Sequence, residues 1–208
     1  MTIGAPKKAT AMTDFLDALR DPGIPFLRYA LAIGLLGSIT FGMIGTYVVA
    51  RRIAFIAGAI SHCILGGIGP ALYLRETYGW QWLHPMHGAV FAALASAIII
   101  GLATLYARER EDSVIGAVWA VGMAIGLLFL ARTPGYIDPM SYVFGNILLI
   151  SPNDLWIVAA LDAFIVIACI AFHPKFTAIC FDEEFARLRG INSGFWYILL
   201  LCLTALTI

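Results

Sequence analysis

Two ionisable side chains stand alone in apolar surroundings, and their chemistry suits the binding of metal ions or protons. His62 lies among small uncharged residues, and imidazole binds zinc, iron and nickel better than calcium or magnesium. Asp162 is a single carboxylate inside a long apolar segment, where a charge is costly and rarely faces lipid. Both are candidates for an ion pathway, and His62 is also a candidate metal ligand. For each, the alternative is a hydrogen bond that only fixes helix packing.

Other potential ligands give weaker signals. His84 and His87 lie three residues apart with Glu76 nearby, which fits either a surface metal cluster or ordinary interfacial histidines. The four cysteines have no C-x-x-C spacing, and an apolar setting favours a structural role for each.

The polar segment over 173–191 carries the signals of a short capped helix. Asp182 is a good N-cap, and Gly190 is a natural residue just past a helix end. The charges in between match the helix dipole, acidic residues first and basic residues last: Glu183, Glu184, Arg187 and Arg189. Phe185 and Leu188 add an apolar side. Such a helix either docks into a groove of a soluble partner or merely connects two membrane spans.

The composition indicates that the elements that position these residues are embedded in a membrane. Of the 208 residues, 61% are apolar and 12% charged, and the mean hydropathy is +0.89. This excludes a soluble enzyme, a disordered chain and a disulfide scaffold. The net charge of zero gives no basic excess for nucleic acid. No P-loop, H-E-x-x-H or G-x-S-x-G motif is present, so we expect no enzyme activity from the chain itself.

The sequence predicts an all-α membrane protein, a helical bundle with about six spans. Uncharged or nearly uncharged windows of spanning length define them: 29–50, 53–74, 87–106, 113–131, 155–174 and 190–208. Residues 1–27 form a tail with a possible interfacial amphipathic helix, and 28–208 form one transmembrane domain. The last window runs off the end of the chain, and we expect a truncated domain.

One apolar stretch, 140–150, is too short to cross a bilayer, and we expect a short re-entrant helix. The distribution of basic residues supports this. If 140–150 does not cross, Arg51, Arg52 and the 173–191 loop share the cytoplasmic side, as the positive-inside rule requires. Small residues predict close helix packing through Gly122 and Gly126, and a broken span at 66–70.

Several ordered segments resemble the permease subunits of zinc-, manganese- and iron-type ABC importers. The matching segments are Ala50-Arg51-Arg52-Ile53-Ala54-Phe55, Ser61-His62, Glu111-Asp112-Ser113-Val114-Ile115-Gly116, Tyr142-Val143-Phe144-Gly145-Asn146-Ile147-Leu148 with Ser151-Pro152, and the 173–191 loop. The resemblance covers about residue 26 to the end.

The resemblance implies a homodimeric permease in a prokaryotic inner membrane, driven by cytoplasmic ATPase subunits and fed by an extracytoplasmic metal-binding protein. No cofactor is held permanently, and the divalent metal ion is the cargo. Residues in the loop would couple to the ATPase: Asp182, Glu183, Glu184, Phe185 and Arg187. By analogy with vitamin B12-type importers, Tyr142, Gly145 and Asn146 would form part of the outer gate.

One departure from the family pattern concerns the cargo. Many members carry an Asp four residues before the His of the Ser-His element, and this chain has Gly58 there. The ion or chelate handled could therefore differ. Two other functions stay open: an ATP-independent transporter or channel with a His62–Asp162 relay, and a purely structural membrane subunit.

Overall fold

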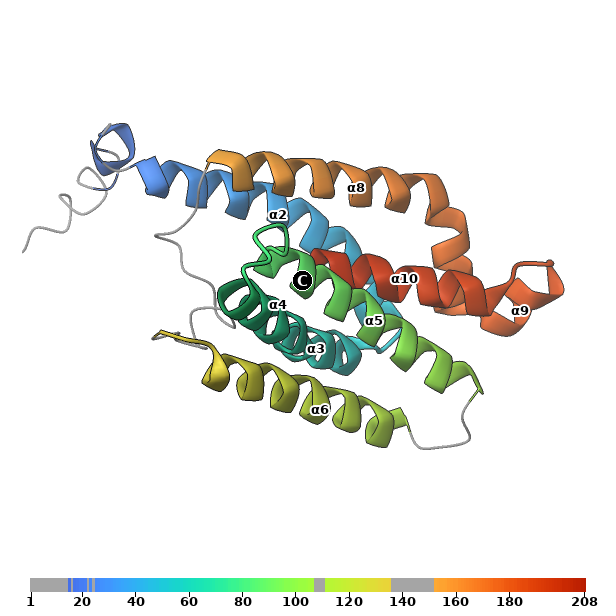
Figure 1. Ribbon diagram of the computed structural model, residues 1–208. Helices are drawn as coiled ribbons and strands as arrows, with labels where there is room; N and C mark the ends of the chain where they lie inside the picture. Colours follow the sequence, from blue (N-terminus) through green and yellow to red (C-terminus); the bar gives the residue numbers. More distant parts are fainter. Residues whose placement is uncertain (1–14, 16, 22, 24, 107–110, 136–151) are drawn as a thin grey trace, which may run out of the picture.

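The computed structural model describes residues 15, 17–21, 23, 25–106, 111–135 and 152–208, and all regular structure among them is helical (Figure 1). The main helices are α2 (Pro25–Ala50), α3 (Ala54–Cys63), α4 (Leu65–Tyr78), α5 (Pro85–Tyr106), α6 (Glu111–Arg132), α8 (Pro152–Phe181), α9 (Glu183–Leu188) and α10 (Ser193–Thr207). Helices α2, α5, α6, α8 and the α3–α4 pair are long and apolar enough to cross a membrane, whereas α10 is a shorter apolar helix. The expected all-α, multi-span architecture is confirmed.

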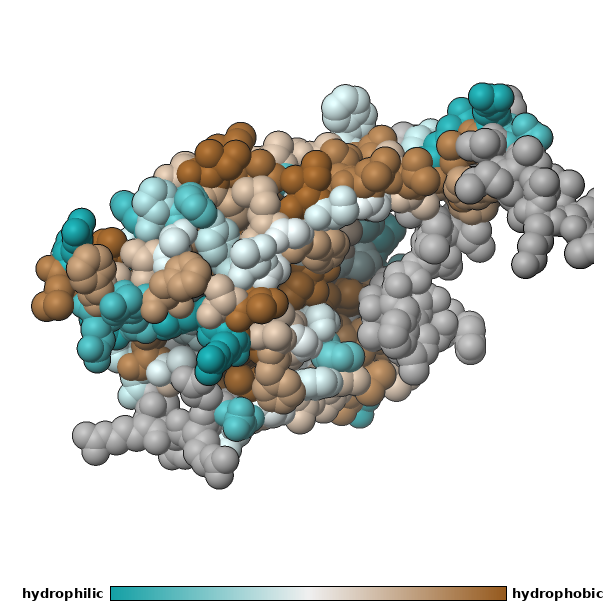
Figure 2. Space-filling view, turned by 180° about the vertical axis from the view of Figure 1, so that it is seen from behind, coloured by the Kyte–Doolittle hydropathy of each residue, from teal (hydrophilic) through white to brown (hydrophobic). Residues whose placement is uncertain are grey.

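The outer surface of the bundle is apolar, as lipid requires. Large hydrophobic side chains are exposed along the long helices, for example Leu35, Phe91, Leu128 and Ile170. Figure 2 shows hydrophobic residues over the sides of the molecule and hydrophilic residues gathered at the end where Figure 1 places α9. Helices satisfy their own backbone hydrogen bonds, so they can expose these faces to hydrocarbon.

The helices pack in two groups around a shared core. Helix α2 lies along α8, while α3 and α4 pack against α5 and α6, and α10 bridges the groups by contacting α5 and α8. Fully buried side chains from different helices meet in this core: Ile60, Ile100, Ile165, Phe176 and Leu200.

Glycines allow α4 to lie very close to both of its neighbours. A Cβ added to Gly66 would lie 2.6 Å from the carbonyl oxygen of Gly122, and one added to Gly69 would lie 2.4 Å from that of Gly126. On the other side, a Cβ on Gly67 would lie 1.9 Å from the carbonyl oxygen of Gly88. The predicted close packing through Gly122 and Gly126 is confirmed, with α4 as the partner.

The predicted break at 66–70 is wrong. The irregularity lies at Ile64, where α3 ends and α4 begins, and the N–H of Gly67 donates to the Ile64 carbonyl oxygen at 2.9 Å. Residues 66–70 belong to α4, although Pro70 lies inside it. Close packing of α5 and α6 against the glycine backbone stabilises a helix that these residues disfavour on their own.

The connection between the last two apolar helices is shorter than the 173–191 loop expected. Helix α8 continues through Pro174 to Phe181 and bends in its C-terminal part (Figure 1), as a proline inside a helix predicts. Helix α10 begins at Ser193 because Asn192 caps it, accepting a hydrogen bond from the N–H of Phe195 at 3.2 Å.

Helix α6 ends and α8 begins at the end of the bundle opposite α9 (Figure 1). The described chain ends on either side of residues 136–151 therefore lie at the same end of the bundle. The segment itself, with the gate candidates Tyr142, Gly145 and Asn146, lies outside the described residues.

Candidate functional site

Helix α9 is a short helix capped at both ends, as its sequence predicts. The side chain of Asp182 accepts a hydrogen bond from the N–H of Phe185 at 2.8 Å. At the other end, Gly190 takes a left-handed conformation with φ of 77°. The N–H of Gly190 then reaches the Arg187 carbonyl oxygen, and the N–H of Ile191 reaches that of Ala186.

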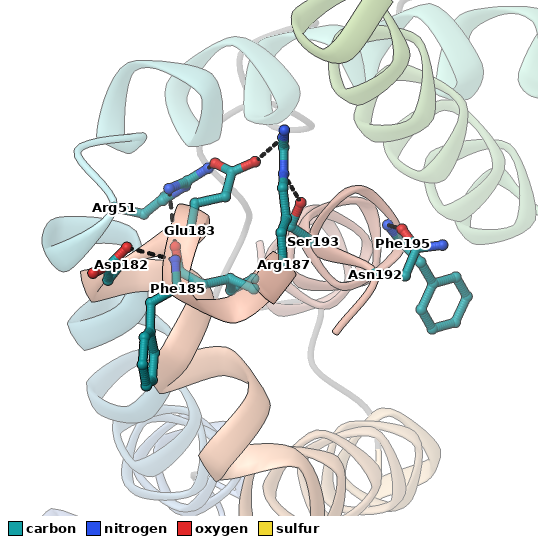
Figure 3. Close-up of polar contacts among 9 residues, drawn as sticks. Arg51, Asp182, Glu183, Phe185, Arg187, Asn192, Ser193 and Phe195 are labelled. Atoms are coloured by element: carbon teal, nitrogen blue, oxygen red, sulfur yellow. Dashed lines mark hydrogen bonds and ion pairs between the residues drawn. The ribbon is translucent and has the colours of Figure 1, made fainter. Parts of the chain in front are cut away.

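Glu183 joins this helix to the membrane-spanning body. Its carboxylate forms ion pairs with Arg51, from the turn between α2 and α3, and with Arg187, one helical turn further along α9 (Figure 3). Arg187 also donates from Nε to the Ser193 hydroxyl at 2.8 Å, which ties α9 to the start of α10.

The same contacts decide the charge of Glu183. Burial raises the pKa of this carboxyl, but hydrogen bonds from Arg51 and Arg187 outweigh burial and hold the pKa below its usual value. The carboxylate is therefore ionised at neutral pH, and the ion pairs are intact there.

The opposite side of α9 is apolar and open. Phe185 is 50% exposed and Leu188 87% exposed, and Phe181 at the end of α8 is 80% exposed. Figure 3 shows the Phe185 ring directed away from the Glu183 contacts, and the Arg189 guanidinium lies 4.9 Å from the centre of that ring. We call Phe181, Phe185 and Leu188 the apolar stripe; large exposed apolar groups at a polar end of a protein indicate a contact surface.

A surface hollow of about 520 Å³ lies beside α9. It is lined by the end of α5 and by the α9–α10 connection, including Tyr106, Arg187 and Asn192. The polar end of the bundle therefore offers both a protruding stripe and a recess.

His62 lies near the end of α3 and stacks on Trp119 of α6, with ring centres 4.5 Å apart and planes 9° apart. Its Nδ1 atom is buried and has no hydrogen-bond partner in the described part of the chain. Within those residues, no three His, Cys, Asp or Glu side chains form a group that could hold a metal ion. His62 is thus a potential ligand that stands apart from any further His, Cys, Asp or Glu cluster of the described residues.

Asp162 occupies a different place, between α8 and α2. One carboxylate oxygen accepts a hydrogen bond from the Thr40 hydroxyl at 2.6 Å, and the other is buried without a partner among the described residues. In the described part of the chain Asp162 and His62 do not contact each other, since Asp162 lies against α2 and His62 lies against α6.

The weaker candidates show no assembled site. The rings of His84 and His87 lie 6.3 Å apart in an exposed position. The four cysteines are free.

Comparison with known sequences gives the class of protein. The sequence model described as the ABC 3 transport family matches residues 23–208. The chain belongs to the ABC 3 transport family. The resemblance to metal-type ABC permeases is confirmed. With five membrane-length helices among its described residues, this family member is a multi-pass protein of the inner membrane.

Named relatives of this ABC 3 family chain belong to metal transport systems. It is 42% identical over 184 residues to the "Probable metal transport system membrane protein" of Chlamydia trachomatis serovar D, which covers 88% of this chain and 62% of the relative. It is 29% identical over 199 residues to the "Manganese transport system membrane protein MntC" of Halalkalibacterium halodurans, covering 95% and 65% of the two chains.

A solved structure shares the fold of this family member. "PsaBC from Streptococcus pneumoniae in complex with Fab" matches with a TM-score of 0.75 and 26% identity, over 94% of this chain and 68% of that chain. The chain spans about three fifths of the length of the first curated relatives, 62% and 58% in two Chlamydia proteins.

Several residues at the site give little signal in the sequence of this ABC 3 family chain. Arg51 is recognisable only as part of the 50–55 segment. No motif in the sequence marks Ser193, Thr40 or Trp119. The Tyr47 hydroxyl lies 2.6 Å from Nδ1 of His173, which joins α2 to α8. Thr40 and Tyr47 are recognisable in the sequence as polar residues inside an apolar window. Their partners, Asp162 and His173, follow only from the fold.

Proposed function

We propose that this chain is the membrane-spanning subunit of an ABC importer for a divalent transition metal ion, powered by a separate cytoplasmic ATPase. The observation that carries the proposal is the arrangement of α9. Its charged side is tied to the membrane body through Glu183, and its apolar stripe is open at the polar end of the bundle. A helix held in this way suits transmission of force from a docked soluble partner.

The residues of α9 divide into two roles. Asp182 caps the helix, while Glu183 and Arg187 hold it against the body. Glu184 and Phe185 are exposed and would contact the ATPase together with Leu188. Closure of the ATPase dimer on ATP would then shift the permease between outward- and inward-open states.

The metal ion would pass near His62, at an interface between two copies of the permease. A buried, unpartnered imidazole nitrogen supports this position. An extracytoplasmic metal-binding protein would deliver the ion, and Tyr142, Gly145 and Asn146 would gate its entry. Asp162 would belong to the pathway or its gate. The names of the relatives favour manganese, while zinc and iron remain alternatives from the resemblance.

Gly58 bears on the choice of metal. A Cβ built on Gly58 meets no other group within 4 Å, so the site has room for a larger side chain. A carboxylate there would stand one helical turn before His62 and could share a metal with it. Its absence from this chain favours an ion or chelate that needs fewer protein ligands.

The test uses the full-length permease assembled with its ATPase in proteoliposomes. We expect Phe185→Ala and Leu188→Asp to lower ATPase binding and metal uptake, because both remove part of the apolar stripe. Phe15→Ala is the matched control, since Phe15 is also exposed but precedes α2. Comparing manganese, zinc and iron as stimulators of ATP hydrolysis identifies the cargo.

A second function is favoured by the partly unpartnered carboxylate of Asp162, which could carry a proton in an ATP-independent transporter. Uptake in cells that lack every cognate ATPase separates the two functions. Undiminished uptake there would overturn the importer and support the alternative.

A further inference from the structure

Arg51 sits at a tight junction between the first two spans. Helix α2 ends in a closed turn, in which the N–H of Ile53 donates to the Val48 carbonyl oxygen at 3.0 Å and that of Arg52 to Val49 at 3.1 Å. Arg52 takes a left-handed conformation with φ of 62°, where glycine is usual. Helix α3 starts at Ala54, so the turn that holds Arg51 is short and well ordered by hydrogen bonds.

The Arg51 side chain reaches three other elements from this turn. It pairs with Glu183 of α9 and donates to the Ile179 carbonyl oxygen of α8 at 2.9 Å. Its guanidinium also lies 5.4 Å from the centre of the Tyr197 ring of α10. The side chains of Arg51 and Glu183 are only 23% and 24% exposed, so solvent screens their attraction less than at an open surface.

The turn leads directly to the candidate transport residue. Helix α3 runs without interruption from Ala54 to Cys63 and carries His62 near its end. The helix rise places His62 roughly 12 Å along the axis from Ala54. A displacement of the turn would therefore shift the His62 ring against Trp119, on which it stacks.

The covalent connections of α9 run to helices other than the one that carries His62. Helix α9 follows α8 and precedes α10, and neither of these helices carries His62. The α3 helix packs mainly on α6 and α5 and less extensively on α10. Among the polar side-chain contacts of α9 with described residues, the ion pair to Arg51 is the one that reaches the α2–α3 turn (Figure 3).

We propose that the Arg51–Glu183 ion pair is the link that carries movement of α9 to the His62-bearing helix. Arg51 is thus a positioning residue, which would act through α3 by its contacts with α8, α9 and α10. This inference rests on the proposed function, because it needs an ATPase that moves α9. The simpler alternative is that the ion pair only holds α9 in place.

The experiment measures ATP hydrolysis and metal uptake together in proteoliposomes that contain the full-length permease and its ATPase. We expect Arg51→Gln and Glu183→Gln to lower the uptake per ATP hydrolysed about tenfold, within the usual range of coupling between sites. Permease-stimulated ATP hydrolysis should persist, since the apolar stripe is untouched. Arg51→Lys keeps the charge and should recover part of the uptake.

The controls separate the possible failures. Arg52→Gln changes the adjacent, exposed arginine and should leave uptake per ATP at the wild-type value. A loss of permease-stimulated ATP hydrolysis in proportion to the loss of uptake in Arg51→Gln and Glu183→Gln would overturn the link in favour of the simple structural role. Wild-type permease that neither binds nor stimulates the ATPase would instead overturn the proposed function itself.

Discussion

At the scale of single residues, Glu183 is the centre of the candidate coupling site. It is a half-buried acid with a basic partner on either side, from the α2–α3 turn and from its own helix. Such a carboxylate is stabilised by its partners in its charged form only. The electrostatics of the site thus depend on the pH and on both arginines.

Stability should depend on Glu183 in a pH-dependent way. The folded pKa is depressed, so its contribution is fully present above the unfolded pKa and is lost as the pH falls through the folded pKa. Glu183→Gln should cost about 1.5 to 3 kcal/mol at neutral pH, the usual contribution of hydrogen bonds to a charged group. The difference from wild type should vanish in strong acid. Thermal unfolding in detergent at several pH values measures it; a difference independent of pH would contradict the electrostatic explanation.

Arg52 offers a test of backbone strain. Its left-handed conformation is one that glycine adopts more easily than arginine. Arg52→Gly should raise the free energy of unfolding by about 1 kcal/mol. Gly190→Ala makes the reverse change at a φ of 77° and should lower it by a similar amount. Melting temperatures in detergent compare the pair, and destabilisation by Arg52→Gly would reveal a contact of the arginine side chain.

At the scale of helices, glycine determines how closely α4 approaches its neighbours. Two glycines of α6 face two glycines of α4, and a further pair joins α4 to α5. In lipid there is little hydrophobic drive to hold helices together, so van der Waals contact of their backbones matters more. The packing of α4 therefore depends on the absence of side chains.

One glycine of α6 should not tolerate even a methyl group. A Cβ on Gly122 would lie 2.4 Å from Sγ of Cys63 and 2.8 Å from its Cα, so the helices must separate. Gly122→Ala should destabilise the bundle by about 1 to 3 kcal/mol, the usual cost of overpacking. Gly116→Ala is the matched control on the same helix, because nothing lies within 4 Å of its added Cβ. Equal stability of the two variants would refute the close contact.

At the scale of the whole molecule, most charged residues that the structure describes lie near helix ends, whereas Asp162 lies well inside α8. Its carboxylate lies between α2 and α8, where Thr40 satisfies one oxygen. Burial of a charge in such a place is costly and is retained where function needs it. Asp162 is therefore a candidate for a role in helix packing, in the proposed ion pathway, or in both.

Replacing Asp162 separates these two contributions. Asp162→Asn keeps an acceptor for Thr40 and removes the charge, so the melting temperature in detergent should stay equal or rise. Metal uptake should fall if Asp162 acts in the pathway. Thr40→Val is the companion variant, since it removes the hydrogen bond and leaves the carboxylate. Full uptake by Asp162→Asn would assign the residue to packing alone.

Much of this architecture could be predicted from local patterns. Apolar windows found the spans within a few residues, and Asp182 and Gly190 marked the ends of α9, because caps and hydrophobic length are properties of short segments. The local signals failed at 66–70 and at Pro174. There, packing against other helices decided the backbone, which no single segment encodes.

By itself, the sequence determined that this is an integral membrane protein, that its spans are helices and that one capped helix lies at a polar end. It did so because hydropathy and capping act over neighbouring residues. Only the tertiary structure decided the partners: Arg51 with Glu183, Thr40 with Asp162, and His62 with Trp119. Each pair joins residues distant in the chain, so their contact depends on how whole helices pack.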